Sequence, residues 1–242
     1  MKNGIDNKVA EIIDETFEVT DITYVPDIND IKLTFGNKAL KLTATTLYID
    51  MRGSTAVLNK HNRSSVAKVH KAYFHTIVTI AKSLGGEVRS FNGDGMLVFF
   101  QGNTQKKLSD AVSSAMKMKW MLTSNDSKVK KKMEKYSSVN FGIGIHYGEI
   151  VCAKVGVSGE NNRDLVWIGN AVNKSVKIGD EIHNDIGISS SVYDNLEDRV
   201  KYVTEKVLYG DDVQKNIWKT GTINYNGSNE KYYYTTYHIE VT

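Results

Sequence analysis

Hydrophobic residues follow two different spacings along the chain, and these spacings predict a succession of strands and helices. Across residues 64–84, apolar side chains recur every three or four positions, which places them on one face of a helix. Between Val139 and Ile145 they alternate with asparagine and glycine, which is typical of a strand with one buried face. The same criteria predict a strand at Thr43–Ile49, a hairpin of strands Glu87–Phe91 and Met96–Phe100, a helix at Leu108–Thr123, a turn at His146–Glu149 leading into a strand at Ile150–Val155, and a helix at Asn170–Ile178.

This order of elements predicts an α+β fold. A β-α-β-β-α-β core with two helices on one face of a mostly antiparallel sheet is ferredoxin-like, and the later segments would add C-terminal strands. The first forty residues contain a helix candidate at Val9–Phe17 and a polar stretch around Pro26. We therefore expect residues 1–40 to form an N-terminal extension packed on the core, and residues 41–242 to form the main domain.

Composition narrows the class of protein without assigning a function. A chain of 242 residues that is 40% hydrophobic can bury a substantial core, and a net charge of +3 favours no particular partner. The sequence has no run of about 18 apolar residues, and its N-terminus lacks the apolar core of a signal peptide. A single cysteine, Cys152, excludes a disulfide within the chain, so we expect a reducing, cytoplasmic location.

The most basic stretch is KVKKKMEK at residues 128–135. A nucleic-acid interface is typically built from basic and aromatic side chains together, and this run has no interleaved aromatic residue. A solvated helix end or loop is therefore the favoured interpretation. Neither nucleic acid nor a membrane is expected as a partner.

Two aspartates carry the strongest chemical signal. Asp50 ends the first core strand, and Asp94 lies at the tip of the hairpin in FNGDG. In a split β-α-β arrangement these strands are neighbours, so both carboxylates can converge on hard cations such as Mg²⁺ or Mn²⁺. A single aspartate at a strand end is structural in most proteins, so spacing alone leaves metal binding the minority interpretation.

Two further segments fit phosphate chemistry. The turn that follows the first core strand offers backbone N–H groups to a phosphate ahead of a helix, from Gly53, Ser54 and Thr55. Asn173 and Lys177 are four residues apart on a predicted helix, so an amide and a cation share one face. They would suit a ribose oxygen and a phosphate, although a solvated helix face is the simpler explanation of that segment alone.

Four motifs in the right order are more specific than any one of them: YIDMRGST, SFNGDGMLVFF, FGIGIHYGEIVCAKVG and WIGNAVNKSVKI. With these, the chain resembles a class III nucleotidyl cyclase domain from about residue 43 to residue 190. The family pattern has a strand ending in aspartate, a helix, a hairpin with a Gly-Asp tip, a strand close to GIHxGE, and a helix opened by IGxxVN. LYIDMRGST together with RSFNGDG also resembles the pyrimidine cyclases of bacterial Pycsar anti-phage systems.

The resemblance implies an obligate homodimer with shared active sites. By motif position, Asp50 and Asp94 would hold two divalent cations, Mn²⁺ or Mg²⁺, with the backbone carbonyl of Met51 assisting. Asn173, from the partner subunit, would match the catalytic asparagine of the family.

Two lysines are placed by the same resemblance. Lys177 stands where the family carries arginine, and lysine keeps the charge but loses the bidentate fork. Lys219, in IWKTG, is the candidate for the lysine that contacts the triphosphate.

The base-reading positions differ from those of both purine cyclases. Four residues before the hairpin aspartate, adenylate cyclases tend to place lysine and guanylate cyclases glutamate, whereas this chain has Ser90. The second position has Val166 in place of Asp, Thr or Cys. A buried valine accepts no hydrogen bond, so the exocyclic groups of a purine would remain unpaired at roughly 1–3 kcal/mol each. Tyr48 lies two residues before Asp50, so its ring either narrows the pocket on the same sheet face or packs as a core aromatic.

A small pocket without purine readers favours a pyrimidine. We favour UTP as the substrate, cyclised to 3′,5′-cyclic UMP by two-metal catalysis, with a separate effector responding to the product during infection. The first alternative is CTP, followed by an adenylate or guanylate cyclase with an unusual pocket. A non-catalytic nucleotide-binding module is the last alternative, and the presence of both aspartates argues against it.

Overall fold

The computed structural model describes residues 1–53, 61–136, 138–157, 162–206 and 211–242. Its core follows the predicted order: β2 (Lys38–Arg52), α3 (Arg63–Ser83), β3 (Glu87–Asn92), β4 (Gly95–Gln101), α4 (Gln105–Thr123) and β5 (Asn140–Gly156). The other elements are α1 (Lys2–Asp14), β1 (Glu18–Asp21), α5 (Lys128–Met133), β6 (Arg163–Ile168), α6 (Asn170–Glu181), β7 (Ile186–Ser189), α7 (Ser190–Asp194), α8 (Asp198–Lys201), β8 (Tyr202–Glu205), β9 (Val213–Asn216), β10 (Lys219–Tyr225) and β11 (Ser228–Thr235). The predicted α+β class with a ferredoxin-like core is confirmed.

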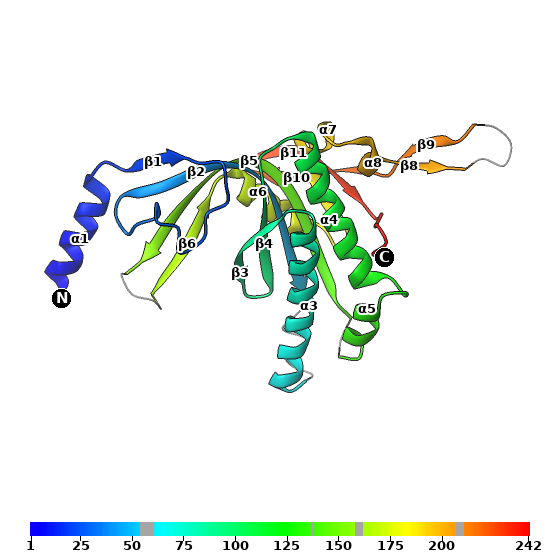
Figure 1. Cartoon of the computed structure of the whole chain (residues 1–242), viewed down its shortest axis with the longest axis horizontal. Coiled ribbons are helices and arrows are strands. Elements are labelled where there is room, and N and C mark those ends of the chain that lie inside the picture. The colour runs from blue at the N-terminus through cyan, green and yellow to red at the C-terminus, as the bar shows by residue number, and fades with distance from the viewer. Residues whose placement is uncertain (54–60, 137, 158–161, 207–210) are drawn as a thin grey trace.

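The central sheet has the strand order β10-β11-β7-β5-β2-β4-β3, with β1 beside β2 and β6 beside β5 (Figure 1). The long strands β2 and β5 pair antiparallel from Ala39 with Ala153 to Arg52 with Asn140. Strands β8 and β9 form a separate hairpin that projects from the body (Figure 1). The β2–β5 pair therefore forms the centre of the sheet.

Successive residues of β2 face opposite sides of the sheet. Leu47 and Ile49 are fully buried in a cluster with residues of α3 and α4, on the side that these helices cover. Tyr48 and Asp50 face the other side, where Tyr48 lies against Gly179 of α6. The alternation thus separates an apolar layer from a layer that carries Tyr48 and Asp50, two of the candidate site residues.

Two glycines of β5 let α6 lie directly on the sheet. A Cβ at Gly142 would come within 2.2 Å of the carbonyl oxygen of Gly179, and one at Gly144 within 2.0 Å of that of Ser175. Real Cβ atoms are not found at such distances, so only glycine permits this approach. The glycines that alternate with the apolar residues of this strand therefore form the contact surface for α6.

The predicted turn at His146–Glu149 is wrong. These residues lie inside β5, where His146 pairs with Thr46 and Gly148 with Ala44 of β2. The sequence signals are local, whereas the pairing with the long strand β2 keeps the strand extended. His146 is a strand residue whose Nδ1 lies 2.8 Å from Ser189 Oγ.

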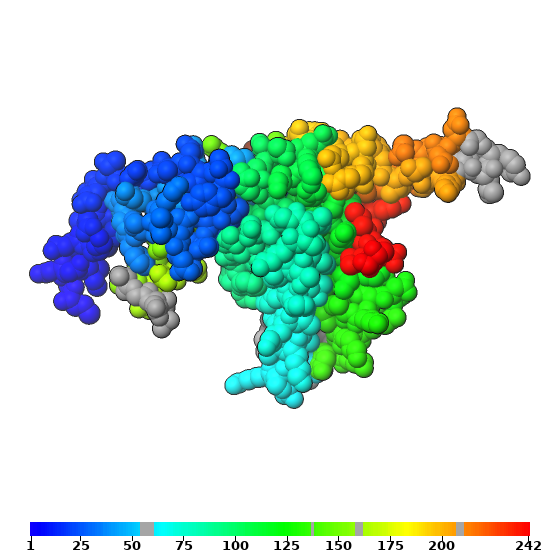
Figure 2. All heavy atoms as spheres, viewed as in Figure 1, coloured from blue at the N-terminus to red at the C-terminus, as the bar shows by residue number. Residues whose placement is uncertain are grey.

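The N-terminal segment has two parts. Helix α1 ends at Asp14, earlier than predicted, has no buried residue, and projects from one end of the molecule (Figure 2). Beyond it, β1 pairs in parallel with β2, and Ile22, Val25 and Leu33 are buried beside Leu40. Residues 22–33 therefore contribute to the core while α1 does not.

Candidate active site

Asp50 and Asp94 lie beside one another at the ends of two paired strands. Asp50 pairs with Gly95 of β4, and the backbone N–H of Met51 donates to the carbonyl oxygen of Asp94 over 3.4 Å. A Cβ at Gly95 would lie 3.0 Å from both Asp50 Oδ1 and the Tyr48 hydroxyl oxygen, so glycine leaves room for these two side chains. The backbone pairing thus places the two aspartates next to each other.

The two carboxylates influence each other electrostatically. The pKa of Asp50 is raised to about 6, by burial first and then by Asp94, while Arg52 and a hydrogen bond from Tyr48 act in the opposite direction. A cation between the carboxylates would relieve this cost. Across the described ranges, no group of three or more His, Cys, Asp or Glu side chains could hold a metal ion. Two carboxylates, backbone carbonyls, water and substrate phosphates together form an all-oxygen donor set, which fits Mg²⁺ or Mn²⁺.

Tyr48 forms part of a small cavity beside these aspartates. The cavity has a volume of about 210 Å³ and is lined by Tyr48, Ser90, Asn92, Met96, Leu97, Val172 and Val176. Burial and the nearby Asp50 charge raise the pKa of Tyr48 above its ordinary value, so the phenol stays protonated. Tyr48 and Ser90, which the sequence placed at a base pocket, are therefore brought together, with α6 as a wall.

Helix α6 turns Val172 and Val176 toward this cavity. Asn173 and Lys177 each follow by one residue, which is about 100° further around the helix. Asn173 is exposed, and Lys177 Nζ lies 2.8 Å from Glu181 Oε1 on its own helix. The predicted shared face of Asn173 and Lys177 is present, but neither residue lines the cavity of the same chain.

Arg52 is a neighbour of the site that sequence reasoning did not single out. Its Nη2 donates to the carbonyl oxygen of Gly179 over 2.6 Å and lies 3.8 Å from Asp180 Oδ1. It therefore ties the end of β2 to the C-terminal turn of α6. The available signal was the period of two along the strand, which puts Arg52 on the same face as Asp50.

Two predicted residues lie far along the sheet from the aspartates. Val166 pairs with Ala153, at the opposite end of β5 from Gly142, which pairs with Asp50. Lys219 begins β10 at the sheet edge, with β11, β7 and β5 between it and β2. One chain therefore does not bring Val166 and Lys219 to Asp50.

The expectation that Val166 is buried is wrong for the single chain. Its side chain is 36% exposed, because Leu165 and Trp167 occupy the covered face of β6 and Val166 points the other way. Gly53 has a φ of 72°, in the left-handed region that favours glycine. Ser54 and Thr55 lie outside the described residues.

A family model described as "Adenylate and Guanylate cyclase catalytic domain" matches residues 39–234. The chain belongs to the class III nucleotidyl cyclase family. It is 30% identical over 224 residues to a uridylate cyclase of Xanthomonas perforans, covering 91% of this chain and 92% of that one. It is 29% identical to a uridylate cyclase of Burkholderia cepacia, covering 80% and 83%. A cytidylate cyclase of Staphylococcus aureus is 24% identical, covering 59% and 37%.

Solved structures agree with this cyclase fold. The adenylyl cyclase CyaB from P. aeruginosa superposes with a TM-score of 0.66 at 18% identity, covering 82% of this chain and 95% of that one. A dimeric guanylyl cyclase domain from the fungus Blastocladiella emersonii gives a TM-score of 0.59 at 16% identity, covering 81% and 97%. These structures show the fold, while the family match and the uridylate cyclase relatives show that the chain is an enzyme with a nucleotidyl cyclase domain.

Two remaining sequence features lie outside the candidate active site. Cys152 is fully buried in an apolar cluster. Within the run at residues 128–135, Lys128–Met133 form the short helix α5, and Lys128, Lys131, Lys132 and Lys135 are exposed. No helix in the part of the chain that the structure describes is long and apolar enough to cross a membrane.

Proposed function

We propose that this cyclase converts UTP into 3′,5′-cyclic UMP and pyrophosphate. The observation that carries the proposal is the small cavity of about 210 Å³ beside Asp50, where Ser90 stands at a base-reading position of the purine cyclases and the ring of Tyr48 narrows the space. The two uridylate cyclases that match over 91% and 80% of the chain support the same substrate.

CTP is the second candidate substrate. The hydroxyl of Ser90 can donate to the O4 of uracil or accept from the N4 of cytosine, so it serves either base. The match to a cytidylate cyclase favours CTP, but it covers only 59% of this chain, against 91% for the Xanthomonas uridylate cyclase. UTP is therefore the better supported of the two.

We further propose that the active form is a homodimer with two shared sites. Asn173 is exposed and does not line the cavity of its own chain, while Val166 and Lys219 lie far from Asp50 in that chain. A second copy that places its Asn173 and Lys177 opposite Asp50 and Asp94 would complete the site. Lys177 would then exchange Glu181 for a phosphate oxygen of the substrate.

In the proposed reaction, the ribose 3′-oxygen attacks the α-phosphorus in line. The bond from the α-phosphorus to the oxygen bridging the β-phosphate breaks, pyrophosphate leaves, and the hydroxyl proton passes to solvent. Two divalent cations, when bound, would lower the pKa of the 3′-hydroxyl and neutralise the triphosphate. Asp50, Asp94 and the carbonyl of Met51 would hold these cations, and Asn173 of the second copy would orient the ribose.

Product identification tests the substrate directly. Purified protein is incubated with equal ATP, GTP, CTP and UTP in Mn²⁺, and the cyclic products are identified by mass spectrometry. We expect cyclic UMP to predominate. Predominant cyclic CMP would establish the second candidate, a cyclic purine would contradict the pocket argument, and no product at all would indicate a binding module.

Mixing of inactive variants tests the shared site. Asp50→Ala and Asn173→Ala should each be inactive, but a heterodimer of the two keeps one intact site. A randomised equal mixture should therefore recover about a quarter of the wild-type turnover. A mixture of Asp50→Ala with Asp94→Ala is the control, because every heterodimer site then lacks one aspartate. Equal recovery in both mixtures would contradict the shared arrangement.

The biological role proposed here rests on the resemblance to the Pycsar cyclases. The product would act in the cytoplasm as a second messenger of anti-phage defence, detected by a separate effector. Plating efficiency of phage on cells that carry the cyclase and its neighbouring genes should rise when Asp94 is replaced by Ala. Unchanged plating would contradict the defence role while leaving the enzymatic proposal intact.

A further inference from the structure

Helices α3 and α5 pack together and neither contains an aspartate or glutamate (Figure 2, cyan and green). Within their bounds, α3 contributes Arg63, Lys68, Lys71 and Lys82, and α5 contributes Lys128, Lys130, Lys131 and Lys132. The whole chain has a net charge of only +3. Positive charge is therefore concentrated on this pair of helices.

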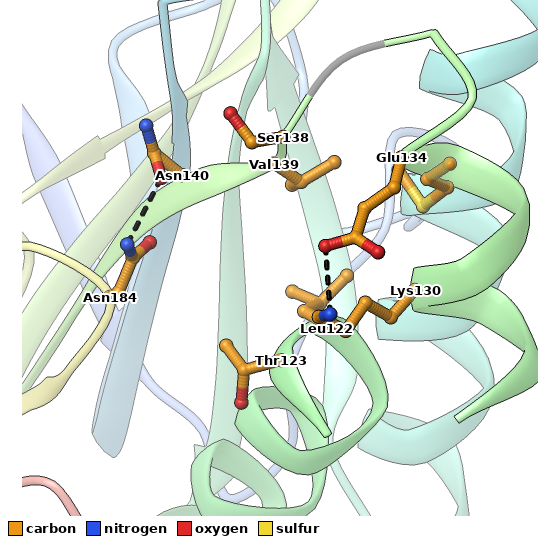
Figure 3. A pocket seen from close by; sticks show the side chains of 9 residues that line it. Leu122, Thr123, Lys130, Glu134, Ser138, Val139, Asn140 and Asn184 are labelled. Atoms are coloured by element: carbon orange, nitrogen blue, oxygen red, sulfur yellow. Dashed lines mark hydrogen bonds and ion pairs between the residues drawn. The ribbon is translucent and has the colours of Figure 1, made fainter. Parts of the chain in front are cut away.

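A hollow of about 340 Å³ lies where the two helices meet. It is lined by Lys68, Val69, Ala72, Lys132, Met133, Lys135 and Tyr136. None of the three lysines forms an ion pair with any described carboxylate. Lys130 differs, because its Nζ lies 2.7 Å from Glu134 Oε1, as Figure 3 shows for a neighbouring pocket. The three lysines of the hollow are thus without a described counter-charge, and so are Lys71, Lys128 and Lys131, which do not line it.

Three unpaired ammonium groups around one hollow repel each other. Water and salt screen this cost at the surface, but they screen it less in a concave site. A multiply charged anion would replace the repulsion with attraction. Because the lysines come from both helices, such an anion would be held between α3 and α5.

The floor of the hollow is apolar, in contrast to the three lysines that also line it. Val69 and Met133 are almost fully buried, and Ala72 and the ring of Tyr136 complete an apolar surface. Ligand pockets are typically apolar with a few convergent polar groups, and they begin at about 300 Å³. This floor fits a flat apolar group but offers few hydrogen-bonding side chains, so it would not read the identity of a base.

The hollow is separate from the candidate active site. Val69 and Met133 belong to the cluster that includes Leu47 and Ile49, on the helix-covered side of the sheet. Tyr48 and Asp50 face the opposite side, toward α6. The sheet therefore lies between the two sites, and one substrate cannot occupy both.

The geometry points to a second ligand site between α3 and α5, which binds a small molecule that carries adjacent phosphate groups through Lys68, Lys132 and Lys135. A nucleotide and an inorganic polyphosphate share this chemistry. A nucleotide would in addition place its base against Tyr136. The inference concerns binding alone and does not depend on which nucleotide the cyclase consumes.

Calorimetric titration of the full chain with tripolyphosphate and with ADP tests the site. EDTA is present, so that cation-dependent binding at Asp50 and Asp94 is suppressed. We expect one site per chain for the wild type, and the same affinity in an Asp50→Asn/Asp94→Asn variant. Loss of binding in that variant would assign the ligand to the active site and overturn the inference.

Matched lysine variants test the position of the site. Lys68→Ala/Lys132→Ala/Lys135→Ala should weaken tripolyphosphate binding by about tenfold or more. The control triple Lys71→Ala/Lys128→Ala/Lys131→Ala removes equal charge from the same surface but no lining residue, and should weaken it by less than about threefold. Equal losses would mean diffuse attraction and no site. Should either triple unfold, Lys132→Glu against Lys131→Glu gives the same comparison.

Two further measurements distinguish a nucleotide from a polyphosphate as the natural ligand. If the natural ligand is a nucleotide, Tyr136→Ala weakens ADP but not tripolyphosphate. If it is a polyphosphate, tripolyphosphate binds more tightly than ADP and neither responds to Tyr136→Ala. A single-stranded RNA that binds more tightly than both, and loses affinity equally in both lysine triples, would overturn the small-molecule site in favour of a nucleic-acid surface.

Discussion

The two faces of the central sheet are built from the same strands but serve different purposes. On the α3–α4 face, Leu47, Ile49 and Ile143 are fully buried among apolar neighbours. On the α6 face, the intervening residues include Tyr48 and Asp50, which are only partly buried and carry polar groups. The period of two along a strand thus lets one face stabilise the fold while the other carries the polar side chains of the candidate active site.

Substitutions on opposite faces should separate turnover from stability. Asp94→Ala should lower turnover at least about a thousandfold, because it removes one of the two carboxylates proposed to hold the cations. Its unfolding free energy should change little. Leu108→Ala, in the apolar layer, should instead cost about 2–5 kcal/mol of unfolding free energy while the folded fraction keeps its turnover. Cyclase assays and urea denaturation measure both quantities. Substantial turnover in Asp94→Ala would contradict the proposal that the α6 face carries the catalytic site.

The close contact between β5 and α6 should be the most sensitive packing feature of the α6 face. Gly144→Ala puts a methyl group 2.0 Å from the Ser175 carbonyl oxygen, so α6 must move, at a cost of about 3 kcal/mol or more. Gly148→Ala, in the same strand, meets only the Ala171 Cβ at 3.8 Å and should be almost neutral. Thermal unfolding measures both, and similar melting temperatures would show that α6 does not lie so close to the sheet.

Much of the fold and of the aspartate pair followed from local sequence signals. Helical spacing gave α3 and α4, and the NGDG turn placed Asp94 beside the end of β2, where the structure has it. The helices and the hairpin turn are predictable because each depends on residues close together in the chain, whereas the approach of Asp94 to Asp50 followed from the predicted β-α-β topology. Spacing alone left metal binding by the two aspartates as the minority interpretation, and the resemblance to the family motifs made it the favoured one.

The errors concern features that depend on distant partners. The local sequence around Gly148 predicts a turn, but the pairing of β5 with β2 keeps this residue in a strand. Val166 reads as core, but Leu165 and Trp167 already occupy the covered face of its strand. The contact of Arg52 with Gly179 joins residues that are 127 positions apart, which no local pattern indicates.

His146 tests how the α6 face responds to acid. Its pKa is lowered to about 4, by burial first and then by Lys174, while Glu230 acts in the opposite direction. As the pH falls, the unfolded state therefore binds the proton before the folded state does. The contribution of neutral His146 to the unfolding free energy is complete above about pH 6.5 and is lost as the pH falls toward 4. Between pH 7 and pH 5 the wild type should lose about 2 kcal/mol more than His146→Asn. Urea denaturation at the two pH values measures this, and parallel losses would contradict the assignment.

Asp50 should show the smallest effect, and it has the opposite sign. Its pKa of about 6 is above the unfolded value of 3.8, so its charge lowers the stability of the metal-free protein at neutral pH. In EDTA at pH 7.5, Asp50→Asn should be more stable than the wild type by on the order of 1 kcal/mol, after allowance for solvent screening. The difference should vanish as the pH falls from 6 to 4. Adding Mn²⁺ should reverse the order, because only the wild type keeps both carboxylates for the cation. A variant that is less stable in EDTA would mean that Asp50 is an ordinary structural residue, and that the α6 face carries no strain that a cation relieves.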